Sequence, residues 1–178
     1  MGRKHLSQSR VFLGIGSNIE RERYIIAGLD AVHELFGELS LSSVYDSAAV
    51  GFEGKPFLNL AACVVTTLSL PELAVALRHI ERMHGRPENA SRFSSRQLDI
   101  DILTYNDEIG IISGVELPRG EILENAFVLR PLAELAPEAM HPVRRRSYAE
   151  LWEAFDQTSQ PLEKVQFSWH GRVISLPA

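Results

Sequence analysis

A two-residue period marks the segment Gln97-Leu98-Asp99-Ile100-Asp101-Ile102-Leu103-Thr104-Tyr105. Apolar and charged residues alternate in it, as they do in a β-strand with one face in a core. Leu98, Ile100 and Ile102 share the core face. Asp99 and Asp101 share the opposite face, with Cα atoms about 6.6 Å apart at the usual rise of a strand. The segment therefore predicts a strand that presents two carboxylates side by side.

A polar loop and an amphipathic helix precede this strand. Residues 86–95 contain Pro87 and several Ser and Asn residues, which favours a loop. Pro71 suits the first turn of a helix, with Ser69 or Leu70 just before it. The apolar residues that follow recur at helical spacing up to Gly85: Leu73, Leu77, Ile80 and Met83.

The remaining elements follow from the same periodicities. We predict strands at 11–15, 39–45 and 57–68, a helix from about residue 25 to Gly37 with Ser17 or Asn18 as its cap, a loop at 47–56, a turn at 106–107, a short hairpin at 109–112, and helices at 127–135 and 148–155. The order β-α-β-β-α-β with added C-terminal helices predicts an α+β, ferredoxin-like sandwich. We expect one domain over residues 1–178, with 1–9 and 156–178 peripheral.

Composition narrows the classes of protein. The chain has 178 residues, 45% hydrophobic content and a net charge of -5, which is typical of a globular domain and does not favour nucleic-acid binding. The one cysteine, Cys63, excludes a disulfide within the chain and a cysteine-based metal site. No apolar run approaches the roughly 18 residues of a membrane span. We expect a cytoplasmic protein that binds neither nucleic acid nor membrane.

The aspartate pair suggests a cation site. Two neighbouring carboxylates repel each other, and a hard cation relieves that repulsion; two cations about 4 Å apart would suit phosphoryl transfer. Arg92 and Arg96 precede the strand and offer fork-shaped donors to a polyphosphate. The alternative is a solvated face whose aspartates pair with arginines. No Walker A motif and no complete G-x-G-x-x-G occurs, which disfavours P-loop and dinucleotide enzymes.

An amide within an apolar strand is a second candidate. Asn59 lies in Phe57-Leu58-Asn59-Leu60-Ala61 and needs partners if it is buried. It could bond to backbone as a structural residue, or it could contact the polar edge of a flat heterocycle. Phe57 or Phe127 could stack on such a ring, although each could also be plain core.

Four motifs together resemble one family. They are Gly16-Ser17-Asn18, Phe57-Leu58-Asn59, Arg96-Gln97-Leu98-Asp99-Ile100-Asp101-Ile102-Leu103, and Phe127-Val128-Leu129-Arg130-Pro131-Leu132-Ala133-Glu134-Leu135-Ala136-Pro137. Over residues 11–155 the chain resembles 6-hydroxymethyl-7,8-dihydropterin pyrophosphokinase. The resemblance implies a ferredoxin-like fold and transfer of the diphosphate of ATP to the pterin hydroxymethyl group, with release of AMP, in folate biosynthesis. It also implies two Mg²⁺ ions, with ATP and the pterin as small-molecule substrates, and we expect a monomer.

The same resemblance implies roles for particular residues. Asp99 and Asp101 look like the ligands of the magnesium ions and, with Arg92 and Arg96, like the catalytic group. The positions that look like pterin contacts are Ser47, Val50, Phe57, Asn59 and Phe127. The positions that look like ATP contacts are Glu81, Arg92, Arg96, Ile102 and Arg119.

Three positions depart from the family pattern. Phe93-Ser94-Ser95-Arg96 stands where a tryptophan and a Gly-Pro-Arg sequence are common, Arg119 stands where a histidine is usual, and Asn125 stands where an arginine often binds phosphate. These changes favour, as one alternative, a relative that transfers poorly or acts on another pterin. A second alternative is a non-catalytic ferredoxin-like module, for example one that binds RNA, but the acidic pair and the negative net charge argue against it.

Overall fold

The computed structural model describes residues 7–47, 54–85 and 97–178. Its main sheet is antiparallel and has the strand order β5-β1-β4-β3-β8, with β2 also paired to β4. These strands are β1 (Ser9–Ser17), β2 (Ser40–Leu41), β3 (Val44–Ser47), β4 (Phe57–Thr66), β5 (Asp99–Tyr105) and β8 (Glu163–Val165). The strands β1, β3, β4 and β5, with one helix after β1 and one after β4, have the order of a ferredoxin-like fold, so the predicted fold class is confirmed.

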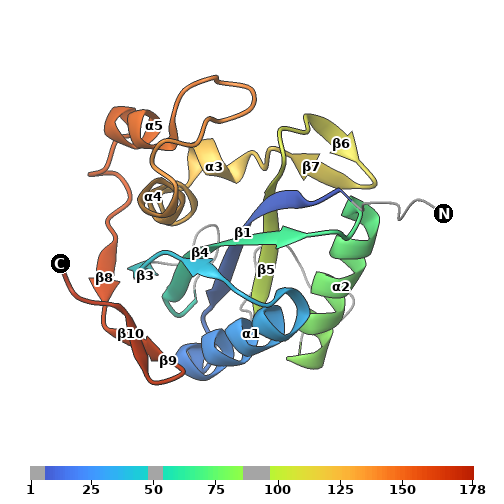
Figure 1. Ribbon diagram of the computed structural model, residues 1–178. Helices are drawn as coiled ribbons and strands as arrows, with labels where there is room; N and C mark the ends of the chain where they lie inside the picture. The colour runs from blue at the N-terminus through green and yellow to red at the C-terminus, as the bar shows by residue number, and fades with distance from the viewer. Residues whose placement is uncertain (1–6, 48–53, 86–96) are drawn as a thin grey trace.

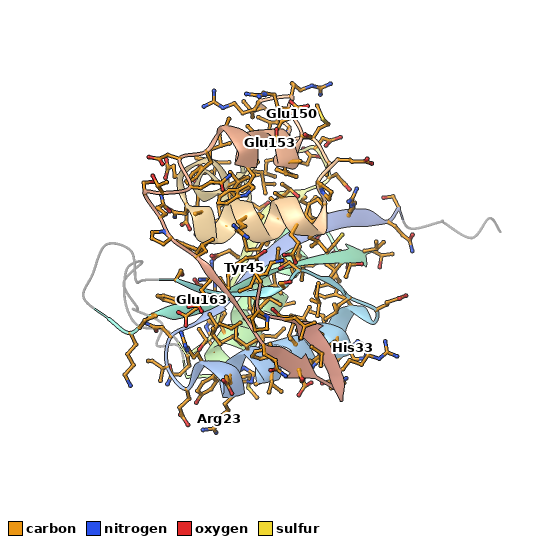
Figure 2. All side chains as sticks on the ribbon, turned by 90° about the vertical axis from the view of Figure 1, so that its left-hand side faces the viewer. Arg23, His33, Tyr45, Glu150, Glu153 and Glu163 are labelled. Carbon is orange, nitrogen blue, oxygen red and sulfur yellow. The ribbon has the colours of Figure 1, made fainter. Side chains whose placement is uncertain are left out.

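Helices cover both faces of this sheet (Figure 1). α1 (Arg21–Phe36) and α2 (Leu70–Met83) lie on one face, and α4 (Ala126–Leu135) lies on the other, flanked by α3 (Glu121–Glu124) and α5 (Tyr148–Ala154). Figure 2 shows the same layers from the side, with His33 of α1 at the bottom and Glu153 of α5 at the top. Within the described residues, no helix is both long and apolar enough to cross a membrane.

Two hydrophobic clusters correspond to the two faces. The larger contains Ile15, Leu60 and Ile100 from the strands and packs under α1 and α2. The smaller contains Phe12 and Leu103 and packs under α4 and α5. Since neighbouring side chains on a strand point to opposite faces, the residues that alternate with the larger cluster, up to Leu103 in β5, lie on the α4 face.

Local sequence explains the helix ends, with one correction. α2 begins with Pro71 in its first turn, as predicted, and Ser69 accepts a hydrogen bond from the Glu72 backbone N–H to form a capping box. Gly37 ends α1 with a φ of 80°. The prediction that Ser17 or Asn18 caps α1 is wrong, because Glu20 occupies that position without a side-chain cap. Both predicted residues precede the start of α1, and Ser17 is the last residue of β1.

Other boundaries differ by a few residues. The predicted strand at 39–45 is two strands, β2 and β3, and the hairpin near residue 110 consists of β6 (Gly110–Ile112) and β7 (Val115–Leu117). α3 was not predicted, since four residues leave almost no helical period to detect. The loop predicted at 86–95 lies outside the described residues.

The segment 156–178, expected to be peripheral, is in part integral to the fold. β8 pairs with β3 in the main sheet, and β9 (Phe167–Trp169) forms a hairpin with β10 (Arg172–Ser175). Phe167 joins the larger core. The buried Ser175 hydroxyl accepts from the Val44 backbone N–H at 2.9 Å, which ties the end of the chain to β3.

Candidate active site

The aspartate pair lies on the α4 face of β5, as predicted. Ile100 and Ile102 point into the core under α1 and α2, so Asp99 and Asp101 point the other way. In the register of the sheet, Asp99 is opposite Gly16 of β1. The Asp101 side chain keeps 27% of its surface exposed, so a ligand can reach it.

Glycines form the floor beside these carboxylates. Gly14 and Gly16 occupy the α4 face of β1, opposite Asp101 and Asp99 on one side and Ala61 and Asn59 on the other. A Cβ atom at Gly16 would lie 2.6 Å from the Asn59 Oδ1 atom, so a side chain there cannot coexist with this Asn59 position. Between β4 and β5, β1 therefore contributes no side chain to this face at Gly14 and Gly16.

Asn59 is a buried amide with a defined partner. Its Nδ2 donates a hydrogen bond to the Ser47 hydroxyl at 3.1 Å, and its side chain is on the α4 face. In the register, Tyr45, Asn59, Gly16 and Asp99 form one row across four strands. The amide and the carboxylates thus share one face, with only glycine between them.

Tyr45 fixes α4 above this face. Its hydroxyl donates to the Glu134 carboxylate of α4, which also accepts the Ser43 backbone N–H. Lys164 of β8 lies 3.3 Å from the same carboxylate. Figure 2 shows Tyr45 between α4 and the strands. Burial and the Glu134 hydrogen bond raise the pKa of Tyr45 to about 12, so it remains a donor at any ordinary pH.

Glu134 is correspondingly held as an anion. Burial works to raise the pKa of its carboxyl group, but the hydrogen bonds from Tyr45 and Ser43 and the charge of Lys164 outweigh burial, and the pKa lies below its ordinary value. The helix that covers the candidate site is therefore attached to two strands, β3 and β8, through one ionised group.

Glu81 lies on the other side of β5. Its Oε2 accepts the Ile100 backbone N–H at 3.0 Å, and the residue is buried. Of the strands that the structure describes, β5 is the edge strand on this side, so Glu81 satisfies a backbone donor that none of these strands pairs. This contact fixes the strand that carries both aspartates.

Arg119 reaches the aspartates from the segment after β7. Its backbone N–H donates to Leu103 O at 2.9 Å, which places it beside β5. Its Nη2 lies 3.6 Å from Asp101 Oδ1 and donates to Glu121 Oε1 at 3.0 Å. Loss of hydration and the charge of Asp99 raise the pKa of Asp101 well above its ordinary value, while Arg119 opposes this shift.

The structure brings some, but not all, of the predicted site residues together. The structure brings Ser47, Asn59, Asp99, Asp101 and Arg119 to the α4 side of the sheet, with the half-buried Phe57 on the same face and Phe127 in the first turn of α4. Ile102 instead points into the larger core, so its side chain does not face the aspartates.

Arg92, Arg96 and Val50 lie outside the described residues, and their roles stay predictions. Sequence reasoning did not place Gly14 and Gly16 beside the aspartates: the pair was considered as an incomplete nucleotide motif, and Gly16 as part of a family motif. Their alternation with the core residues of β1 was the signal that could have found them.

The carboxylates fit magnesium bound together with a phosphate substrate. In the described part of the chain, no group of three or more His, Cys, Asp or Glu side chains forms a metal cluster. Mg²⁺ is usually held by one or two carboxylates and by substrate phosphates rather than by an all-protein cage. Asp99 and Asp101 supply that number of ligands, so the donor set suits Mg²⁺ when a polyphosphate is present.

The fold and the site thus define a ferredoxin-like α+β protein whose acidic face suits a phosphate substrate and its cation. Residues 12–137 match the model of the 7,8-dihydro-6-hydroxymethylpterin-pyrophosphokinase (HPPK) family. The chain belongs to this family, and with it to the pyrophosphokinases of folate biosynthesis.

Known proteins agree with this assignment. A 2-amino-4-hydroxy-6-hydroxymethyldihydropteridine pyrophosphokinase of Aquifex aeolicus is 34% identical over 142 residues, which cover 79% of this chain and 88% of the relative. The protein of the same name from Pseudomonas aeruginosa is 35% identical over 137 residues, covering 75% and 84%. Among solved structures, wild-type HPPK-DHPS of Plasmodium falciparum with pteroate has a TM-score of 0.72 at 14% identity and covers 98% of this chain. This chain spans 48% of that longer one, and the likeness shows the fold.

Proposed function

We propose that the chain transfers the diphosphate of ATP to the hydroxymethyl oxygen of 6-hydroxymethyl-7,8-dihydropterin on the face formed by Asn59, Gly16 and Asp99. The observation that carries the proposal is their shared row across the sheet. An amide at one end of that row can hold a flat heterocycle by its polar edge. Carboxylates at the other end can hold a cation and the phosphates.

The chemistry is a single substitution at phosphorus. The pterin oxygen forms a bond to the β-phosphorus of ATP, the bond from that phosphorus to the α–β bridging oxygen breaks, AMP leaves, and the hydroxyl proton passes to solvent. Asp99 and Asp101 would hold two Mg²⁺ ions, which supply neutralising charge to the phosphate oxygens. The contribution of the protein is positioning: it aligns the two substrates and keeps the developing charge near fixed groups.

The remaining roles follow the family resemblance. Ser47, Val50, Phe57, Asn59 and Phe127 would bind the pterin, and Glu81, Arg92, Arg96, Ile102 and Arg119 would bind ATP. For Ser47 and Asn59 the support is their hydrogen bond and shared face. For Arg119 it is the position beside Asp101. Since Ile102 is buried in the core, a nucleotide contact there would come from its backbone. The monomeric state and the cytoplasmic location also stay predictions.

The test is AMP release with ATP, MgCl₂ and 6-hydroxymethyl-7,8-dihydropterin, together with the mass of the pterin product. We expect pterin-dependent AMP and a product heavier by one diphosphate, and loss of both on replacing Mg²⁺ by EDTA. Tight pterin binding without any AMP would contradict the proposed reaction and favour the poorly transferring relative. AMP formation that continues in EDTA would contradict the magnesium assignment alone.

A further inference from the structure

The carboxylates of the candidate site already have a counter-ion from the protein. Arg119 Nη2 lies 3.6 Å from Asp101 Oδ1 and 3.0 Å from Glu121 Oε1. The negative charges of Asp99, Glu121 and Glu81 disfavour the ionised form of the Asp101 carboxylate. The positive charge of Arg119 favours it. A divalent cation that approaches Asp101 therefore meets a group of its own sign at one of its ligands.

The guanidinium is held in a way that permits it to move. Its contact with Asp101 is an ion pair at 3.6 Å rather than a short hydrogen bond, and its firmer partner is Glu121. Its Nε is buried and has no hydrogen-bond partner among the described residues. A buried donor without a partner costs free energy, so a ligand that supplies an acceptor gains from drawing the group toward itself.

A polyphosphate is such a ligand. Its oxygens accept in the bidentate geometry that a guanidinium offers, and they are more highly charged than a single carboxylate. Nucleotide would thus take Arg119 away from Asp101 at the moment when the cation that accompanies it needs that oxygen.

We infer that Arg119 is a built-in counter-ion of the metal site, which competes with divalent cations for Asp101 in the nucleotide-free protein and moves to the polyphosphate when nucleotide binds. The inference rests on the proposed function for the metal-binding role of Asp101. Its consequence is ordered loading: metal alone binds weakly, and metal with nucleotide binds well.

Mn²⁺ binding, measured by the loss of the free-ion EPR signal, tests the first half of this inference without turnover. Without nucleotide, Arg119→Gln and Arg119→Met should each bind Mn²⁺ about tenfold more tightly than the wild type, because a close opposing charge is removed from a partly exposed site. Arg119→Lys should stay within about threefold of the wild type, because it keeps the charge. Arg146→Gln removes the same charge from an exposed ion pair with Glu150 and should change nothing. Unchanged or weaker Mn²⁺ binding in the two neutral variants would overturn the competition.

A non-hydrolysable ATP analogue tests the second half. With the analogue present, Arg119→Gln should bind Mn²⁺ and nucleotide several-fold more weakly than the wild type, the opposite sign to its effect without nucleotide. A purely structural lesion would weaken both states alike, which would also overturn the inference. An unchanged affinity with the analogue would overturn the movement to phosphate.

Asp101→Asn separates this inference from the function on which it rests. If Asp101→Asn loses Mn²⁺ binding while Arg119→Gln binds Mn²⁺ with the affinity of the wild type, the counter-ion role is wrong and the metal assignment survives. If Asp101→Asn binds Mn²⁺ as the wild type does, the metal assignment is wrong and the counter-ion role falls with it.

Discussion

Asn59 and Asp99 lie on the same face of the sheet, on the two strands that flank β1, and Gly16 of β1 pairs with both of them. Two strand spacings separate their Cα atoms by about 10 Å. The intervening residue has no side chain, and the Asn59 amide lies over it, with Oδ1 2.6 Å from the position that a Gly16 Cβ would take. The amide that would hold the pterin and the carboxylate that would hold the phosphates are thus placed relative to each other by the pairing of three strands.

Gly16→Ala should weaken pterin binding selectively. The new Cβ would lie 2.6 Å from Asn59 Oδ1 and must displace that amide. We expect the KM for the pterin to rise at least about tenfold, which corresponds to about 1.4 kcal/mol, with little change in the KM for ATP. Gly14→Ala is the matched control, because the nearest atom to its Cβ would belong to the Leu103 side chain, at 3.4 Å. Equal effects of the two substitutions would argue against a role of Gly16 in placing Asn59.

Ser47→Ala should also disturb the position of the Asn59 amide, through the loss of a hydrogen bond. The substitution removes the acceptor of the Asn59 Nδ2 hydrogen bond and leaves a buried donor, which typically costs about 1–3 kcal/mol. We expect a lower midpoint in urea denaturation and a several-fold higher pterin KM. Ser168→Ala, at an exposed position of β9, should change neither. A pterin KM that stays at the wild-type value would show that the Ser47 contact does not orient Asn59.

Asp99→Asn and Asp101→Asn should separate activity from stability. Each should lower kcat by orders of magnitude if the pair holds the cations, while thermal unfolding shows a fold at least as stable as the wild type, because two carboxylates on one strand face repel each other. Asp107→Asn, in the exposed turn after β5, controls for the loss of a negative charge. Near-normal turnover in both variants would refute the metal assignment.

Glu134→Gln should destabilise the protein in a pH-dependent manner. The pKa of Glu134 is lowered, so its contribution to stability is present above the ordinary value of 4.5 and is lost as the pH falls through its lower folded-state pKa. We expect the variant to lose about 2 kcal/mol at pH 7, typical of hydrogen bonds to a charged group, and less at pH 3.5. Urea denaturation at both pH values measures this, with the exposed Glu153→Gln as the control. A difference that does not shrink in acid would contradict the ionised state of Glu134.

His141→Gln should reduce the loss of unfolding free energy that accompanies a fall in pH. Burial and the charge of Arg144 lower the pKa of His141, and its Nδ1 accepts the backbone N–H groups of Val143 at 3.2 Å and Arg144 at 3.0 Å. The unfolded chain binds a proton near pH 6.5 and the folded one binds it only at lower pH, so stability falls as the pH drops below about 6.5.

The free energy of unfolding of the wild type should therefore decrease between pH 7.5 and 5.5 by more than that of His141→Gln. His79→Gln, at an exposed position of α2, should behave as the wild type. Parallel profiles for wild type and His141→Gln would exclude His141 as a source of acid sensitivity.

Periodicity and composition predicted the α+β fold because its strands and long helices each have one clear apolar face. The same alternation placed Asp99 and Asp101 correctly, since Ile100 and Ile102 fix the orientation of β5. Contacts between distant segments could not be predicted this way. The Glu134 bonds to Tyr45 and Ser43 span about ninety residues, and nothing in the local sequence of α4 encodes them. The C-terminal strands were missed for a related reason: β8 has three residues and is defined by its partner β3.

The pairing of β8 with β3 also bears on synthesis of the chain. Until residues 163–175 emerge from the ribosome, β3 has an unpaired edge and Glu134 lacks Lys164. An exposed strand edge pairs readily with other chains. From the synthesis of β3 to that of β8 the growing chain thus has an unpaired strand edge, and a stop codon ahead of residue 163 would leave that edge unpaired permanently.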